Sequence, residues 1–217
     1  MKPRPGLKRR RAQKRALSAV LYDSLEPRHL LATDVGLAFT GSTYQTDSSY
    51  YPPDANGDVG RDHMIEVLNG RINMMSREDG VRVQSLTMTQ FFENSGSFVY
   101  NDPINPKVVF DQLSDRWFVA ANGTDNGNWL YLAVSAEADP TQGWQQVQFV
   151  GDSSGIQFND QVSLSVDADA VYMTTNNTGP FGGPTVSIYS IPKTDLLGAD
   201  ATLTNMSRFE DLDPAEF

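Results

Sequence analysis

Short runs of β-branched and aromatic residues recur along most of the chain, and clusters of Gly, Pro, Asn and Asp separate them. Apolar runs of this length between turn-forming residues are typical of β-strands. The clearest runs predict strands at Met64–Leu68, Trp117–Ala121 and Val171–Thr175. The same part of the chain contains no convincing amphipathic helix. The pattern therefore predicts an all-β domain.

The three predicted strands lie within a repeated pattern. Each copy begins with Asp, passes through one variable residue to two large apolar residues, and ends with Asn after three further residues. The copies are Asp62–Asn69, Asp115–Asn122 and Asp169–Asn176, and their spacings are 53 and 54 residues. Asp suits a turn because its side chain bonds nearby backbone amides, and Asn tolerates left-handed backbone geometry where a strand ends. Each unit is therefore expected to hold two or three antiparallel strands.

A flanking position completes the repeat: Asp58, Asp111 and Ser165 each stand four residues before a copy. A period near 50 residues with several strands per unit is typical of β-propeller blades. The alternative is that Asp and Asn recur by chance in an all-β sequence. Propellers close with about 4–8 blades, whereas the 185 residues after Ala32 hold about three and a half units. We therefore expect β-propeller-like repeats of about 53 residues that form an incomplete propeller, as in a fragment of a longer protein. An open or smaller β assembly is the alternative.

Charge divides the chain into two parts. Through Ala32 the net charge is +7, and from Thr33 onward it is −17. So acidic a body disfavours binding to nucleic acid, which needs a basic surface. The absence of cysteine excludes disulfides, zinc–thiolate sites and cysteine nucleophiles. No apolar run reaches the ~18–20 residues that a transmembrane helix needs. We expect a disordered basic leader at 1–32 and one β domain at 33–217.

The leader combines a basic cluster at 8–15 with a short apolar stretch at 16–22, which is the order of parts in a secretory signal. A nucleic-acid-binding arm, a nuclear localisation cluster and a plain disordered tail are the alternatives on charge alone. The next residues, Ser24–Ala32, read SLEPRHLLA. This segment resembles the LEPR-XLL segment of many bacterial surface and secreted proteins. The resemblance implies export, and hence a secreted or cell-surface location.

The body also resembles a known group of sequences. Its motifs PPDANGDVG, PKVVFDQLSDRW and DPTQGW occur in this order, within a resemblance that spans roughly residues 50 to 190. They are similar to phrases in a largely uncharacterised family of bacterial extracellular propeller-like proteins. The resemblance implies the same fold and does not bring an activity with it.

One loop is a candidate calcium site. Asp54, Asn56 and Asp58 alternate along the chain, as they do where a loop offers several hard oxygens to Ca²⁺. An EF-hand would need Gly and Glu at its sixth and twelfth positions, which are Val59 and Ile65 here, so the loop is not an EF-hand. A turn in which these side chains bond their own backbone is the alternative.

No catalytic motif stands out. The body has a single histidine, His63, and no Ser in a nucleophile-elbow context, so a Ser-His-Asp triad has no support. We therefore expect a non-catalytic exported module that binds calcium, a protein or a glycan at the cell surface. The alternative is an extracellular polysaccharide hydrolase or lyase with paired carboxylates. The acids considered for such a pair are Asp111, Asp115, Asp160, Asp167 and Asp169.

Overall fold

The computed structural model describes residues 38–216 except 97, 100, 125–127 and 180–182. All described residues belong to one compact unit, Leu37–Phe217. The leader at 1–32, with its LEPR-XLL resemblance, lies outside the described residues. None of the helices in the described part of the chain is long and apolar enough to span a membrane.

Three antiparallel sheets of four strands make up this unit, and each is a meander in chain order. The first sheet holds β1 (Asn56–Val59), β2 (His63–Leu68), β3 (Arg71–Ser76) and β4 (Arg82–Leu86). The second sheet holds β5 (Ile104–Asp111), β6 (Arg116–Asn122), β7 (Trp129–Ser135) and β8 (Trp144–Val150). The third sheet holds β9 (Phe158–Val166), β10 (Ala170–Thr178), β11 (Thr185–Pro192) and β12 (Ser207–Leu212). The prediction of an all-β domain is confirmed.

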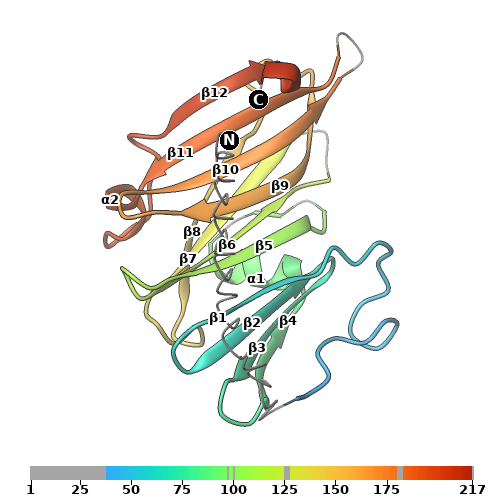
Figure 1. The fold of residues 1–217 in the computed structure, drawn as a ribbon, viewed down its shortest axis with the longest axis vertical. Helices are drawn as coiled ribbons and strands as arrows, with labels where there is room; N and C mark the ends of the chain where they lie inside the picture. Colours follow the sequence, from blue (N-terminus) through green and yellow to red (C-terminus); the bar gives the residue numbers. More distant parts are fainter. Residues whose placement is uncertain (1–37, 97, 100, 125–127, 180–182, 217) are drawn as a thin grey trace, which may run out of the picture. The chain divides into compact units, whose positions relative to one another are not determined.

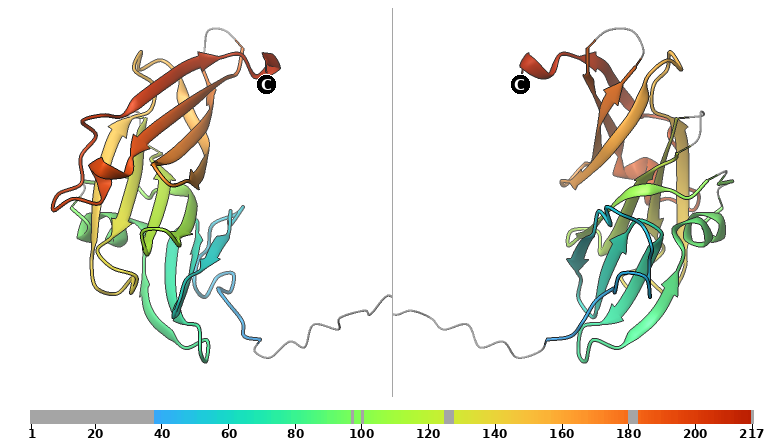
Figure 2. Two further views of the ribbon diagram at one scale, coloured as in Figure 1. Left: turned by 60° about the vertical axis from the view of Figure 1, so that its left-hand side comes forward. Right: turned by 90° about the vertical axis from the view of Figure 1, so that its right-hand side faces the viewer.

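The three strands predicted from the repeat lie within β2, β6 and β10, which are the second strands of their sheets. Figure 2 shows the sheets from two further directions, with β1–β4 in teal, β5–β8 in green to yellow and β9–β12 in orange to red. First strands of successive sheets are neighbours, since β5 contacts both β1 and β9. Each sheet thus repeats the same order of strands beside its neighbour.

Alternate side chains of β6 point to the two neighbouring sheets. Ile65 and Val67 of β2 share a buried cluster with Trp117 and Val119 of β6. The intervening Phe118 and Ala120 of β6 belong to a second cluster with Val171 and Met173 of β10. Because successive residues of a strand face opposite sides, both faces of the middle sheet are buried in packing.

Short helices connect and close the sheets. Helix α1 (Met88–Asn94) follows the first sheet, α2 (Lys193–Leu196) follows β11, and a 3-10 turn spans Pro214–Glu216. The sequence predicted no amphipathic helix in this domain, and α1 shows that this prediction is wrong. Thr87 caps this helix: its Oγ1 accepts from the Gln90 amide, and its own amide donates to Gln90 Oε1. That capping box stabilises a single short helix, whose Phe91 and Phe92 pack against Trp144 and Tyr131 of the second sheet.

One flanking equivalence predicted from the sequence is wrong. Asp58 pairs with Ile65 and Ser165 with Tyr172, which are matching positions of the repeat. Asp111 instead pairs with Arg116 at the end of its hairpin. The equivalent pair in the second sheet is Val109–Phe118, which encloses two more residues than Asp58–Ile65 does, so equal spacing in sequence does not give equal register here.

Candidate functional site

The three sheets share an equivalent position on their first strands. Val67, Ala120 and Thr174 occupy the same place in the repeat, and their strand partners are Asn56, Lys107 and Ser163. Two residues before these partners stand Asp54, Asn105 and Gln161. All three have a positive φ, of 45°, 52° and 51°. A left-handed non-glycine residue thus recurs once per sheet.

The register around these residues is irregular in the same way in two of the sheets. Pairing shifts between Ile104 and Lys107 in β5. It shifts again in β9, opposite Thr174 and Asn176, where Gln161 lies. A β-bulge of this kind bends the strand and re-aims a side chain, and bulges are frequent beside functional sites. The shared irregularity therefore directs Asn105 and Gln161 to the same side.

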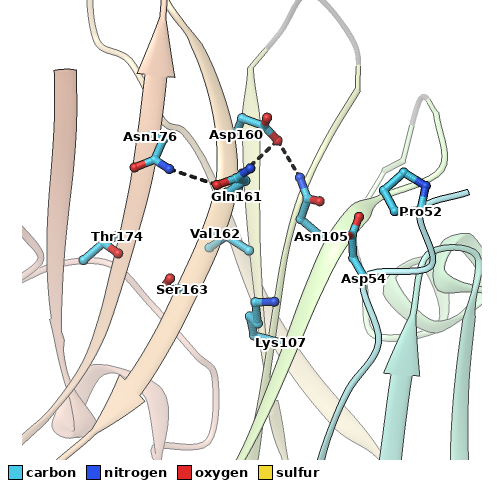
Figure 3. A pocket seen from close by; sticks show the side chains of 10 residues that line it. All are labelled: Pro52, Asp54, Asn105, Lys107, Asp160, Gln161, Val162, Ser163, Thr174 and Asn176. Carbon is cyan, nitrogen blue, oxygen red and sulfur yellow. Dashed lines mark hydrogen bonds between the residues drawn. The ribbon is translucent and has the colours of Figure 1, made fainter. Parts of the chain in front are cut away.

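The three left-handed residues line one cleft of about 410 Å³ (Figure 3). It lies along the first strands of the sheets and reaches β10 at Thr174 and Asn176. The remaining lining groups are mostly polar or charged, namely Lys107, Asp160 and Ser163, with Pro52 and Val162 as the apolar exceptions. We refer to this feature as the polar cleft.

A chain of hydrogen bonds runs along the polar cleft. Asn69 Nδ2 donates to Asp54 Oδ2 at 2.7 Å, and Asn69 Oδ1 accepts from the Asn105 amide at 2.7 Å. Asn105 Nδ2 donates to Asp160 Oδ1 at 2.6 Å. The same oxygen accepts from the Gln161 amide at 2.8 Å, and Asn176 Nδ2 donates to Gln161 Oε1 at 3.0 Å. The chain links all three sheets, so the positions of the cleft residues are coupled. Figure 3 shows its part from Asn105 to Asn176.

The charged groups of the cleft are two carboxylates, Asp54 and Asp160, and the Lys107 ammonium. Within the described part of the chain, Lys107 has no ion-pair partner within 4.0 Å and no side-chain hydrogen bond is recorded for it. An ammonium carries three donors, whereas carboxylates only accept. The cleft therefore offers both donors and acceptors, which suits a ligand whose groups do both, as hydroxyl groups do.

The residues of the predicted calcium loop are held mainly by the neighbouring strand. Asn56 Oδ1 accepts from the Val108 amide at 2.9 Å, and Asp58 Oδ2 accepts from the Phe110 amide at 2.7 Å. Asp54 faces the polar cleft instead. Among residues 38–216 with the gaps given above, no group of three or more His, Cys, Asp or Glu side chains is arranged to hold a metal. Two of the three loop residues thus join β1 to β5, and calcium binding stays a prediction.

The acids considered for a hydrolase are distributed over the sheets. Asp111 pairs with the buried Lys193 at 2.6 Å, and Asp115 pairs with Arg61 at 2.6 Å. Asp167 accepts from the amides of Asp169 and Ala170 in its turn. These hydrogen bonds lower the pKa of Asp167. Of the five acids, Asp160 alone lines the polar cleft.

Sequence reasoning missed Asn105, Lys107 and Gln161. The segments around the three left-handed positions read PDAN, INPK and DQVS, which share no common letter pattern. For Gln161 the signal was Asn176, which closes its copy of the repeat 15 residues later and bonds it, as Asn69 bonds Asp54. Asn122 gave no such signal for Asn105, because it donates to the Asn159 carbonyl. Asn69, Asn122 and Asn176 had been assigned only to strand ends.

Comparisons with known proteins add little to this geometry. No protein-family model matches the chain, and no curated protein matches it. One solved structure that resembles it is described as "Crystal structure of putative exo-beta-1,3-galactanase from Bifidobacterium bifidum s17". The TM-score is 0.42 at 13% sequence identity, covering 73% of this chain and 51% of that one. The chain spans about half the length of that protein, and a likeness of this size shows neither a shared fold nor a shared activity.

Proposed function

We propose that this protein is an exported, non-catalytic, propeller-like module that binds a neutral glycan in the polar cleft. The observation that carries the proposal is the convergence of three equivalent left-handed residues, Asp54, Asn105 and Gln161, on one polar cleft. Left-handed geometry costs a non-glycine residue about 1–2 kcal/mol, and such strain gathers at functional sites.

The propeller-like part of the proposal rests on the order and packing of the sheets. Each sheet is a four-stranded meander, as a propeller blade is. The first strands lie beside one another, as they do around the axis of a propeller. The same faces pack at both interfaces, with Ile65 toward Trp117 and Phe118 toward Val171. Three such sheets make fewer blades than the smallest closed propeller has.

The glycan part follows from the chemistry of the cleft. Asp160 and Asp54 provide acceptors, Lys107 provides donors, and Asn105 with Gln161 provides both. Sugar hydroxyls donate and accept, so they match such a lining. An anionic ligand would face two carboxylates against one ammonium, which disfavours charged sugars. The acidic body, −17 from Thr33 onward, adds to that repulsion.

Export is proposed from the leader alone, because the segment SLEPRHLLA resembles the LEPR-XLL segment of surface and secreted proteins. A reporter fused after Ala32 should leave the cytoplasm of a suitable bacterial host. The same reporter without residues 1–32 should stay inside. Equal retention of both would contradict export.

A second function has one observation in its favour. Asp54 and Asp160 line the same cleft, and a glycoside hydrolase needs two carboxylates that flank the scissile bond. This reading predicts that a bound oligosaccharide is cleaved and that Asp160→Asn abolishes cleavage while binding persists. The non-catalytic proposal predicts that bound oligosaccharides are recovered intact from the wild-type protein.

The test is a screen of the full chain against immobilised neutral and acidic glycans, followed by calorimetric titration of the best ligand. Gln161→Ala should weaken binding by about tenfold, the effect of losing roughly one good hydrogen bond to a ligand. Gln142→Ala removes an equally polar side chain from an exposed turn outside the cleft and should leave binding unchanged. Preferential binding of acidic glycans, or equal effects of the two variants, would overturn the proposal.

A further inference from the structure

A second cavity lies on the other side of the segment that borders the polar cleft. It measures about 540 Å³. Tyr51, Pro53 and Ala55 line it, whereas Pro52 and Asp54 of the same segment line the polar cleft. Alternate residues of this segment thus line two separate cavities. We call the second one the tyrosine cavity.

Three tyrosines line this cavity: Tyr44, Tyr50 and Tyr51. Tyr44 and Tyr51 are 59% and 87% exposed, although large aromatic side chains are usually buried. Tyr50, the third tyrosine, is held in place because its hydroxyl donates a hydrogen bond to Asp102 at 2.6 Å. That hydrogen bond raises the pKa of Tyr50 to about 12, so this ring is neutral at physiological pH. No hydrogen bond holds the hydroxyls of Tyr44 and Tyr51 within the described part of the chain.

One charged side chain lines the tyrosine cavity, and it is a carboxylate. Glu66 of β2 accepts hydrogen bonds from the Ser42 amide at 3.0 Å and from Asn73 Nδ2 at 3.0 Å. Burial raises the pKa of Glu66, but the hydrogen bonds from Ser42 and Asn73 outweigh it, so the pKa lies below its usual value. The nearby Arg82 is paired with Asp47 at 2.6 Å. The charge of Arg82 also lowers the pKa of Glu66, but none of the side chains that line the cavity is cationic.

We propose that the tyrosine cavity binds an organic cation of the alkylammonium class, with Tyr44 and Tyr51 against its methyl groups and Glu66 supplying the opposite charge. Aromatic faces attract such cations through their quadrupole, and quaternary ammonium groups are recognised in this way. An apolar lining with a single negative charge matches a ligand that is apolar on its surface and positive overall. The proposal is independent of the polar cleft and of its glycan.

The test compares two ligands of the same shape and different charge. Choline and 3,3-dimethyl-1-butanol differ in having a quaternary nitrogen or a quaternary carbon at the same position. Calorimetric titration of the full chain should give choline an affinity at least about tenfold higher, since the cation–aromatic and carboxylate attractions act on it alone. Equal affinities would identify the site as an apolar cavity without preference for a cation, and would overturn the proposal.

Variants identify the groups responsible. Glu66→Gln keeps the shape and should weaken choline binding by about tenfold while leaving the uncharged alcohol unaffected. Tyr51→Leu changes a side chain that is 87% exposed, so folding is not at risk. It should weaken choline binding by about fivefold. Tyr172→Leu changes a half-buried tyrosine of the third sheet, outside the cavity, and as a control should have no effect on choline binding. Unchanged binding by the Glu66 variant, or equal effects of the two tyrosine variants, would contradict the assignment.

Discussion

The interfaces between the sheets and the polar cleft are built from neighbouring strands that differ in regularity. At the interfaces, apolar side chains such as Trp117 and Phe118 are fully buried and alternate with the regular period of a strand. At the cleft, the first strands break that regularity with bulges and left-handed residues, and polar groups line the space. The regular strands bury the apolar side chains that stabilise the fold, whereas the irregular first strands present the polar groups of the cleft. Substitutions at the interfaces should therefore lower the free energy of unfolding, whereas substitutions in the cleft should mainly weaken ligand binding.

The largest loss is expected at Trp117→Ala. Trp117 has 0% exposure, its ring lies 4.8 Å from that of Phe110, and its Nε1 donates to the Ala138 carbonyl at 2.9 Å. Removing a buried Trp leaves a cavity and a free carbonyl, which costs about 4 kcal/mol of unfolding free energy. Chemical denaturation measures it, with the exposed Leu113→Ala as a control that should change little. A loss below about 1 kcal/mol would mean that this interface does not hold the sheets together.

A smaller loss is expected at the buried ion pair. Lys193 of α2 meets Asp111 at 2.6 Å, and both side chains are almost fully buried. Lys193→Met leaves the Asp111 carboxylate buried without its partner, which should cost about 3 kcal/mol. The exposed pair Arg61–Asp115 offers the matched control, Arg61→Met, which should change stability little because solvent screens that pair. Similar losses in both variants would show that burial of the pair has no special weight.

The same pair gives a pH dependence. Burial raises the pKa of Asp111, but hydrogen bonds from Lys193, Ser114 and Leu113 outweigh it and lower the pKa. A lowered folded-state pKa adds stability at pH values above the unfolded-state value of about 3.9. That stability is lost as the pH falls through the folded-state value. Lys193→Met should therefore flatten the acid side of the stability profile, and an unchanged profile would contradict this origin.

The sequence predicted the regular region well and the irregular region poorly. Apolar runs between turn residues located β2, β6 and β10, because buried strands need apolar side chains and the turns between them favour Asp and Asn. It could not locate Asn105 and Gln161, since their shared feature is a backbone conformation that Asn and Gln reach without a common motif. The Asp111–Lys193 pair was also missed, because it joins residues that only tertiary folding brings together. The calcium loop was predicted from its alternating Asp and Asn residues. In the structure, the side chains of Asn56 and Asp58 accept hydrogen bonds from amides of β5.

The predicted calcium loop borders the polar cleft, because Asp54 lines that cleft. If Asp54 and its neighbours bind Ca²⁺, an excess of ten times Kd should stabilise the fold by about 1.4 kcal/mol. Thermal unfolding with calcium, magnesium and salt at matched ionic strength measures this. Asp54→Asn is the suitable variant, because it spares the bonds that Asn56 and Asp58 make to β5. Equal stabilisation by magnesium, or by calcium in the variant, would show that the loop is only a turn.

The smallest change in stability is expected at Gln161→Gly, and it should be favourable. Glycine relieves a left-handed strain of about 1–2 kcal/mol but loses about 0.5–1 kcal/mol more entropy on folding. The net gain should be about 0.5 kcal/mol, with a smaller gain at Asn105→Gly because Asn tolerates this geometry better. Glycan binding should fall in both variants. A clear loss of stability at Gln161→Gly would mean that its side chain holds the fold and not the ligand.

The most direct test of the central claim follows the backbone amides of Asp54, Asn105 and Gln161 by nuclear magnetic resonance while a neutral oligosaccharide from the glycan screen is added. If three equivalent residues build one binding cleft, their three signals should shift together and fit one Kd. The signals of Gln142 and Leu113, in turns outside the cleft, should stay in place. Shifts that miss the three residues, or that fit separate Kd values for them, would contradict the claim that the polar cleft is a single ligand site.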